Sequence, residues 1–475
     1  MARKQQEPIF ETLTISAMGN EGVSIARNEE GIVRFIKYGA PGDTVIAEIR
    51  SKRKKYADGI IKEILEPSQY RIDPTCQYFG TCGGCSWQHV DYNQQLAWKR
   101  QIVEDVCTRI GKFPHPPIEQ TIPSPKQFHY RNKMEFSFGS SSWLTEEQIS
   151  SNEEFTKGFA LGLHIPGRFD KILNVHECHL QREQANILLE AVHEKSNELS
   201  LQGYDPRSHE GFLRTLLIRT SEFSGELMAV LITQPTKQEH EELFLSWWYQ
   251  IREHFPFITS ALHCINTSWS PMAQGEIIHS SGPEFITESI LGISFTISPF
   301  SFFQTNSFQL DQFVSEILKQ ADITENSIVW DLYCGAGTIT LPAAKLARKV
   351  YGIELSASSI ANAKHNQQLN SIHNVSFYAH DLHTSSTLSI LQQFERPDII
   401  IVDPPRAGIH EMLLNHIVSI AAPTIVYVSC NPSTQARDIA ILSEAYEVTS
   451  IIPVDMFPQT AHVESIATLQ LKMSY

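Results

Sequence analysis

Strand-like and helix-like runs alternate through the C-terminal part of the chain, from about residue 301. SIVWDLYCGAGTITLPAAKLA, at residues 327–347, reads as a strand, a glycine-containing loop and a helix. Further strand-like runs are KVYGIEL, NVSFYAHD, DIIIVDPPR and TIVYVSCNP, and helix-like stretches separate most of them. This alternation is typical of a doubly wound parallel sheet. YEVTSIIPVD and VESIATLQLKM lie so close together that we expect an antiparallel pair at the end of the sheet.

Polar residues stand at the ends of the first three strands of this predicted sheet. The loop DLYCGAG ends the first strand, and its glycines let the backbone approach a ligand closely. Glu354 ends the second strand, where a carboxylate can accept hydrogen bonds from ribose hydroxyls, and Asp381 ends the third, where it could meet an adenine. These acids could instead cap helices. Three such strand ends in series favour a nucleoside site, and the absence of G-x-G-x-x-G argues against a nicotinamide dinucleotide.

The N-terminal stretch, residues 9–66, alternates short apolar runs with turns that contain Gly, Pro and Asp. This spacing predicts a small all-β barrel. The basic run RSKRKKY, with Arg50, Lys52, Arg53, Lys54 and Lys55, lies between two of its strands. It could be a solvated hairpin tip or a set of phosphate contacts. The net charge of −15 argues against a protein that coats nucleic acid by overall charge, so a local basic surface would have to do this.

The sequence predicts a cytoplasmic protein that does not enter a membrane. MARKQQEP lacks the apolar stretch of a signal peptide, and no run approaches the roughly 18 apolar residues that span a bilayer. Thiols stay reduced in the cytoplasm, so the eight cysteines need another explanation than disulfides. Cys107 and Cys264 lie in apolar runs and are expected to be core residues.

Four other cysteines have the spacing of metal ligands. Cys76, Cys82 and Cys85 form a C-x5-C-x2-C pattern, and Cys178 lies far downstream. Four thiolates suit either an iron–sulfur cluster or zinc. Zinc ribbons usually pair two C-x2-C units, whereas this segment has one. His89, His176 and His179 lie nearby and are expected at the surface or behind the ligands.

Another thiol, Cys430, follows the strand-like run TIVYVS and precedes the turn Asn431-Pro432. A cysteine at the mouth of a buried strand is presented to a ligand. The preceding strand ends in Asp403-Pro404-Pro405-Arg406, whereas an amino methyltransferase would need only a polar clamp of the Asp-Pro-Pro kind. Carbon 5 of uracil is a poor nucleophile, and adding a thiolate to carbon 6 activates it.

Several ordered motifs resemble the RNA uracil-5-methyltransferase family. They are DLYCGAGT, DPPRAG, YVSCNP and HVES at residues 462–465, with SPFSFFQTN at 298–306 leading into the catalytic part. The resemblance runs from about residue 8 to 475 and is closest to the bacterial 23S rRNA branch. It implies an OB-like TRAM barrel at residues 1–69 and a central α+β iron–sulfur and RNA-binding domain at 70–297. It also implies an α/β class I, Rossmann-like methyltransferase domain at 298–475, against which helix 91–112 could pack.

The resemblance also implies roles for individual residues. Cys430 would add to carbon 6 of uracil, and Glu464 would remove the proton from carbon 5, with His462 as the alternative base. S-adenosyl-L-methionine would be bound by Gln304, Tyr333, Glu354, Asp381 and Asp403. Cys76, Cys82, Cys85 and Cys178 would bind a 4Fe–4S cluster.

The expected substrate is 23S rRNA, because the transfer-RNA branch of the family typically lacks the cluster. Transfer RNA is the alternative, and no obligate protein partner is expected. HYRNKMEF matches a family segment beside the RNA and supplies Arg131 and Lys133, unless it is a plain edge strand with exposed cations. A cytosine-5 enzyme would usually carry a Pro-Cys pair, which is missing here. A non-catalytic RNA-binding iron–sulfur protein would leave DLYCGAG, Cys430 and Glu464 without a purpose.

Overall fold

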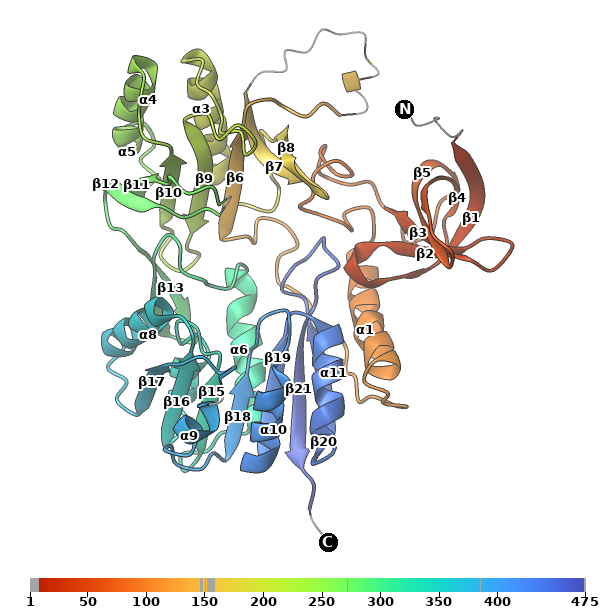
Figure 1. Cartoon of the computed structure of the whole chain (residues 1–475), viewed down its shortest axis with the longest axis vertical. Helices are drawn as coiled ribbons and strands as arrows, with labels where there is room; N and C mark the ends of the chain where they lie inside the picture. Colours follow the sequence, from red (N-terminus) through yellow and green to blue (C-terminus); the bar gives the residue numbers. More distant parts are fainter. Residues whose placement is uncertain are drawn as a thin grey trace.

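The computed structural model describes residues 8–145, 148–149, 151, 159–270, 272–384 and 386–473. Figure 1 shows a small barrel in red, a central sheet with helices in yellow and green, and a C-terminal sheet in cyan and blue. Helix α1, Tyr92–Arg109, lies between the barrel and the C-terminal sheet. Within the described residues, no helix has the length and apolar character needed to cross a membrane.

The structure confirms the small barrel that the sequence predicted, and its strands close in the order β1-β2-β3-β5-β4. Its strands are β1 (Ile9–Met18), β2 (Ser24–Arg27), β3 (Val33–Lys37), β4 (Thr44–Lys52) and β5 (Tyr56–Glu66). Leu13, Ile15 and Ile36 are among the apolar side chains that fill its interior. At the β4–β5 hairpin tip, Arg53, Lys54 and Lys55 are exposed, as both interpretations of the basic run require.

Helix α1 confirms the helix expected near residues 91–112, and its buried face is partly polar. Asp91 caps its first turn by accepting a hydrogen bond from the Asn93 backbone N–H at 3.0 Å. Gln95 and Lys99 are fully buried, whereas the apolar Ile110 after its C-terminal end is 42% exposed. The reason is that this face packs partly against a polar loop of the C-terminal part.

The central part is a seven-stranded sheet in the order β12-β11-β10-β9-β6-β7-β8. Its strands are β6 (Lys133–Gly139), β7 (Ala160–Ile165), β8 (Arg168–Asn174), β9 (Leu213–Thr220), β10 (Leu227–Thr233), β11 (Ser260–Ile265) and β12 (Glu276–Ser281). Its helices are α3 (Glu183–Glu198), α4 (Glu239–Tyr249) and α5 (Ile251–His254). Strand β6 pairs with β9 through residues 133–137 and with β7 through residues 137–139. The part of HYRNKMEF in this strand, residues 133–136, therefore pairs on one side only, and the alternative of an edge strand stays open.

The C-terminal sheet has the order β17-β16-β15-β18-β19-β21-β20. Its strands are β15 (Ile328–Leu332), β16 (Lys349–Glu354), β17 (Val375–Ala379), β18 (Ile399–Val402), β19 (Thr424–Ser429), β20 (Tyr446–Val454) and β21 (Glu464–Leu471). Strands β15 to β19 are parallel, and β21 runs antiparallel to both β19 and β20. This confirms the doubly wound α/β sheet and the antiparallel pair at its end, in which only β21 is reversed.

Helices cover both faces of this sheet (Figure 1). They are α6 (Ser307–Ala321), α7 (Thr340–Ala344), α8 (Ala357–Leu369), α9 (Thr387–Leu391), α10 (Glu411–Ile420) and α11 (Pro432–Leu442). The hairpin of β13 (Ile286–Ile290) and β14 (Ile293–Ile297) bonds to α8, where the Thr296 N–H donates to Asn366 Oδ1 at 3.0 Å. The domain boundaries at residues 69–70 and 297–298 stay predictions. Strand order reverses between β15 and β18, which is where open α/β sheets bind ligands.

Candidate active site

A cavity of about 560 Å³ opens at the carboxyl ends of β15, β16, β18 and β19. The structure brings all seven predicted catalytic and cofactor residues to this one cavity. They are Gln304, Tyr333, Glu354, Asp381, Asp403, Cys430 and Glu464. Thr338, Arg406 and His462 line it as well.

The glycine loop after β15 forms one wall of the cavity. Tyr333 has a φ of +68°, in the left-handed region that non-glycine residues rarely adopt, and its N–H donates to the Ile353 carbonyl at 2.9 Å. Gly335 and Gly337 also have positive φ. Glu354 holds the loop, because its Oε2 accepts a hydrogen bond from the Gly335 N–H at 3.3 Å. The loop is thus shaped by its own strand and by the end of β16.

Asp331 is a candidate residue that the sequence analysis did not single out. It is buried beneath the glycine loop, and Thr340 Oγ1 donates to its Oδ2 at 2.5 Å. Among the described residues its Oδ1 has no hydrogen-bond partner, and burial raises the pKa of this carboxyl to about 7. A buried, unpaired oxygen in a ligand cavity is poised to accept a hydrogen bond. The first letter of DLYCGAG, an acid inside an apolar strand, was the available signal.

Strand register brings Cys430 beside two carboxylates. Val402 of β18 pairs with Tyr427 of β19, and Ser429 pairs with Ser465 of β21. Asp403, Cys430 and Glu464 each stand next to one of these paired positions, so three separate strand ends converge.

The turn after Cys430 is tied to the end of β18. Asn431 caps α11 by accepting a hydrogen bond from the Ser433 N–H at 3.1 Å. Its side-chain Nδ2 donates to the Arg406 carbonyl at 3.0 Å, and Thr434 Oγ1 donates to the same carbonyl at 3.2 Å. The residues around Asp-Pro-Pro-Arg and Ser-Cys-Asn-Pro therefore form one connected structure.

Burial raises the pKa values of the acidic groups of this corner. It raises the pKa of the Cys430 thiol to about 11, and the nearby Glu464 and Asp403 carboxylates add to this effect while Arg406 opposes it. Burial also raises the pKa of Glu464 to about 8, again with Asp403 adding and Arg406 opposing. Asp403 is only partly buried as a residue, but its carboxyl group is enclosed, and this raises its pKa to about 7. The pKa values of Asp403 and Glu464 lie close to neutrality, which suits acid–base chemistry.

His462 differs from Glu464 as a proton acceptor. Much of its side chain is exposed, yet desolvation of the ring, together with the nearby cations Arg406, Lys99 and Arg131, lowers its pKa to about 4. Glu464 is 4% exposed and has the higher pKa. Glu464 is therefore the stronger base of the two.

A second cavity, of about 620 Å³, is lined by Cys76, Cys82, Cys85 and Cys178 together with Arg131 and Lys133. All four cysteines are free thiols. Burial, with a smaller contribution from the neighbouring thiols, raises the pKa of Cys82 and Cys85 to about 12 each. The Gly84 N–H donates to Cys82 Sγ at 3.3 Å, and Gln88 Nε2 donates to Cys85 Sγ at 3.2 Å. Donors aimed at sulfur favour thiolates, so these residues fit a site that binds a metal through sulfur.

Among the described residues, His176, Glu190 and His193 offer three possible ligand atoms that lie within 4.8 Å of one another. His89, expected at the surface or behind the ligands, is 1% exposed and packs against Phe79, so it is not a surface histidine.

The two cavities adjoin, because Phe302 and Thr305 line both. Arg131 and Lys133 thus line the cysteine cavity, which adjoins the cavity that holds Cys430.

Comparison with known proteins agrees with this geometry. The family model of tRNA (uracil-5-)-methyltransferases matches residues 293–472. A protein of Bacteroides thetaiotaomicron named as an uncharacterized RNA methyltransferase is 40% identical, covering 96% of this chain and 100% of its own length. A protein of the same description from Porphyromonas gingivalis is 38% identical and covers 96% and 99%.

A solved structure resembles the whole chain. It is the Pyrococcus abyssi tRNA (uracil-54, C5)-methyltransferase in complex with S-adenosyl-L-homocysteine, with a TM-score of 0.73 and 27% identity. The match covers 97% of this chain and 100% of that one. With relatives that share its full length and a cavity in which Cys430, Asp403 and Glu464 converge, the chain belongs to the RNA uracil-5-methyltransferase family of S-adenosylmethionine-dependent enzymes.

Proposed function

We propose that the protein transfers a methyl group from S-adenosylmethionine to carbon 5 of a uridine in RNA, through a covalent adduct of Cys430. The observation that carries this proposal is the convergence of Cys430, Asp403 and Glu464 in one cavity beside the glycine loop. An amino methyltransferase has no use for a nucleophilic thiol at this place, and an RNA-binding protein has no use for a buried base.

The cofactor occupies the part of the cavity formed by the glycine loop, Glu354 and Asp381. Glu354 still has lone pairs for the ribose hydroxyls although it holds Gly335, because a carboxylate can accept about four hydrogen bonds. Tyr333 and Gln304 border the same space, and Asp403 lies between it and Cys430. The S-adenosyl-L-homocysteine of the Pyrococcus abyssi enzyme supports this assignment.

Attack on the uracil begins with a thiol that is mostly protonated at neutral pH, since its pKa is about 11. Cys430 must therefore lose its proton to solvent water as the Sγ–C6 bond forms, and Arg406 stabilises the developing thiolate. The C5=C6 electron pair moves to give an enolate, and carbon 5 then takes the methyl group from the sulfonium of the cofactor. S-adenosylhomocysteine leaves with the electron pair of the broken bond.

Release of the product needs a base. Glu464 takes the proton from carbon 5, the C5=C6 bond re-forms, and the Sγ–C6 bond breaks to free the Cys430 thiolate. Glu464 cannot have taken the thiol proton earlier and kept it, because a carboxylate that holds a proton is no longer a base. Its pKa of about 8 makes it a better acceptor than His462, with a pKa of about 4.

The four cysteines hold a 4Fe–4S cluster, with zinc as the alternative. The four thiols that line one cavity, with N–H donors aimed at the Cys82 and Cys85 sulfurs, support a site with sulfur ligands. Bound there, the cluster would cross-link the segment of Cys76, Cys82 and Cys85 to Cys178. Methyl transfer itself requires no redox step.

The RNA lies across the two adjoining cavities, beside Arg131 and Lys133. Its uridine must be unpaired or flipped out to reach Cys430. We propose 23S rRNA as the substrate and the cytoplasm as the location, with no obligate protein partner, and transfer RNA as the alternative substrate. The domains follow the predicted limits of 1–69, 70–297 and 298–475.

One experiment tests these proposals together. The protein is incubated with cofactor labelled in the methyl group and with total RNA from cells that lack the enzyme. Nucleoside analysis should find the label in 5-methyluridine, and fractionation should find it in 23S rRNA. Label in 5-methylcytidine would overturn the uracil chemistry, label in transfer RNA would favour the alternative substrate, and unlabelled RNA would leave only a binding protein.

A further inference from the structure

The loop between β20 and β21 carries the proposed base, and its position decides where that base lies. It runs from Asp455 to Val463, and Glu464 follows immediately as the first residue of β21. At the other end, Val454 pairs directly with Glu464. Phe457 and His462 of the same loop line the active-site cavity. A shift of this loop would therefore move both the base and the wall beside it.

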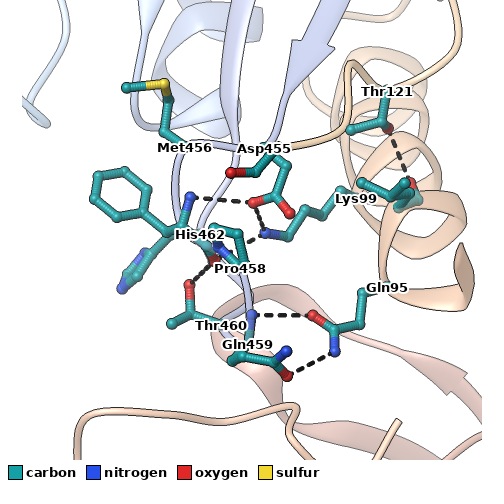
Figure 2. Close-up of polar contacts among 12 residues, drawn as sticks. Gln95, Lys99, Thr121, Asp455, Met456, Pro458, Gln459, Thr460 and His462 are labelled. Atoms are coloured by element: carbon teal, nitrogen blue, oxygen red, sulfur yellow. Dashed lines mark hydrogen bonds and ion pairs between the residues drawn. The ribbon is translucent and has the colours of Figure 1, made fainter. Parts of the chain in front are cut away.

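Helix α1 holds the first half of the loop through a buried ion pair (Figure 2). Lys99 Nζ lies 2.5 Å from Asp455 Oδ1, and both side chains are 0% exposed. Lys99 also donates to the Phe457 carbonyl at 3.1 Å, and the Phe457 N–H donates to Asp455 Oδ1 at 3.1 Å. Tyr92 on the same helix donates to Asp455 Oδ2 at 2.9 Å. Burying such a pair is costly, and it is tolerated only when its hydrogen bonds are satisfied in this way.

Helix α1 also holds the second half of the loop. Gln95 Nε2 donates to Gln459 Oε1 at 3.0 Å, and the Gln459 N–H donates to Gln95 Oε1 at 3.1 Å (Figure 2). Gln459 has a φ of +68°, which a non-glycine residue adopts only when its surroundings impose it.

The segment that follows Cys85 completes the contacts. The N–H groups of Ser86 and Trp87 both donate to the Gln459 carbonyl at 3.0 Å. The Ala461 N–H donates to Ser86 Oγ at 3.1 Å. Two segments that are distant in sequence therefore bind the loop. Lys99 and Asp455, for example, are 356 positions apart.

We propose that Lys99 and Gln95 are positioning residues for the methyl-transfer reaction, which fix the loop that places Glu464 for removal of the carbon-5 proton. This inference rests on the proposed function of Glu464. Neither residue touches the substrate; each acts through the loop. Weakening the anchor should slow elimination, the last step, more than attack or methyl transfer, because Cys430 and the glycine loop have no contact with α1 in this network.

The decisive variant replaces the ion pair by apolar side chains of similar size, Lys99→Met with Asp455→Leu. Removing one partner alone would leave an unpaired buried charge and could prevent folding, whereas replacing both is often neutral for stability. Turnover on saturating RNA should fall by about tenfold to a hundredfold, the scale expected for a misplaced catalytic group. The KM for S-adenosylmethionine should stay within about twofold. Denaturing electrophoresis should show methyl-labelled protein bonded to RNA, at a higher steady-state level than in the wild type.

A second variant and a structural readout guard against a failure to fold. Gln95→Met removes the reciprocal pair with Gln459 while keeping the side-chain volume, and should show a smaller rise of the same adduct. Hydrogen exchange of residues 455–463 should quicken in both variants, while exchange in β15 to β19 stays unchanged. As a matched control, Arg34→Met with Glu11→Leu removes an ion pair of the barrel, at 2.7 Å, far from the loop in sequence. It should leave the adduct level and turnover on saturating RNA unchanged.

The outcomes separate this inference from the proposed function. If the wild-type enzyme places no methyl group on uridine, the proposed function fails. If the wild type methylates but both α1 variants turn over normally without extra adduct, the anchor is only structural and the inference is wrong. Loss of adduct together with turnover in both variants would also overturn it, because attack rather than elimination would then depend on α1.

Discussion

At the scale of single residues, the site depends on how strongly burial opposes negative charge. Cys430, Asp403 and Glu464 share one corner with Arg406, the cation that opposes the raised pKa values of Cys430 and Glu464. Ionising all three groups at once would leave excess negative charge in a space of low polarity. The proposed mechanism avoids this, because the thiol forms a neutral thioether before Glu464 takes its proton.

The order of the two steps gives a direct prediction. Glu464→Gln should still attack the uracil and still methylate it, but elimination should stall, so protein and RNA stay bonded through Cys430. The complex should survive denaturing electrophoresis and carry labelled methyl. Cys430→Ala is the matched control and should give no adduct while binding the cofactor normally. Full turnover of Glu464→Gln would assign the base elsewhere, with His462 as the first candidate.

The pKa of Glu464 also predicts a dependence of stability on pH. Its folded-state pKa is about 8, above its ordinary value of 4.5, so folding favours the protonated form. This contribution to stability is present below about pH 4.5 and is lost as the pH rises through 8. Glu464→Gln should therefore be more stable than the wild type at pH 9, by on the order of a few kcal/mol, and not at pH 4. Thermal melts of the cofactor-free proteins at both pH values measure this; parallel pH curves would contradict it.

At the scale of elements, most of the site residues that the sequence could predict lie at the ends of strands. A strand followed by a glycine loop, an acid or a cysteine has a fixed place in a parallel sheet, so the sequence alone assigns Glu354, Asp403 and Cys430 to one edge of that sheet. Helix α1 could not be read in the same way. Lys99 and Gln95 look like solvent-facing residues in sequence, and only the contact with Asp455 and Gln459 explains their burial.

Glu354, the last residue of β16, is the basis of a prediction about cofactor binding. Glu354→Ala should weaken binding of S-adenosylmethionine by about 1–3 kcal/mol, because it removes a ribose partner and the support of the Gly335 N–H. Calorimetry measures the affinity, and RNA affinity should barely move. Unchanged cofactor affinity would place the nucleoside elsewhere in the cavity.

The β4–β5 hairpin tip supplies a prediction for RNA binding. Replacing Arg53, Lys54 and Lys55 with Gln should weaken RNA binding and flatten its dependence on salt, if these exposed cations contact phosphates. Turnover on a short RNA at saturation should survive, since the tip is outside the residues that line the active-site cavity. An unchanged salt slope would show that the tip is only solvated.

At the scale of the whole molecule, α1 and the cysteine segment join parts that are distant in sequence. Trp98 and Ile102 of α1 pack with Trp87 and with Met18 of the barrel. Val103 and Val106 of the same helix belong to the apolar core of the C-terminal sheet. The resemblance implied that this helix could pack on the methyltransferase domain. Local patterns could not predict that it also packs with the barrel, because contacts between distant segments leave no periodic signal.

The metal content of the cysteine cavity gives a prediction about how these distant parts are held together. Cys178 comes from the central part, whereas Cys85 directly precedes the Ser86 and Trp87 that bind the loop before Glu464. Protein purified without oxygen should be brown and contain about four irons per chain. Cys178→Ser should lose the metal and lower the melting temperature, because ligation and folding are coupled. Cys264→Ala, at a buried cysteine outside that cavity, should keep the iron whatever it does to stability. Stoichiometric zinc without iron in the wild type would refute the cluster, and a Cys178→Ser protein that retained its iron would remove Cys178 from the ligands.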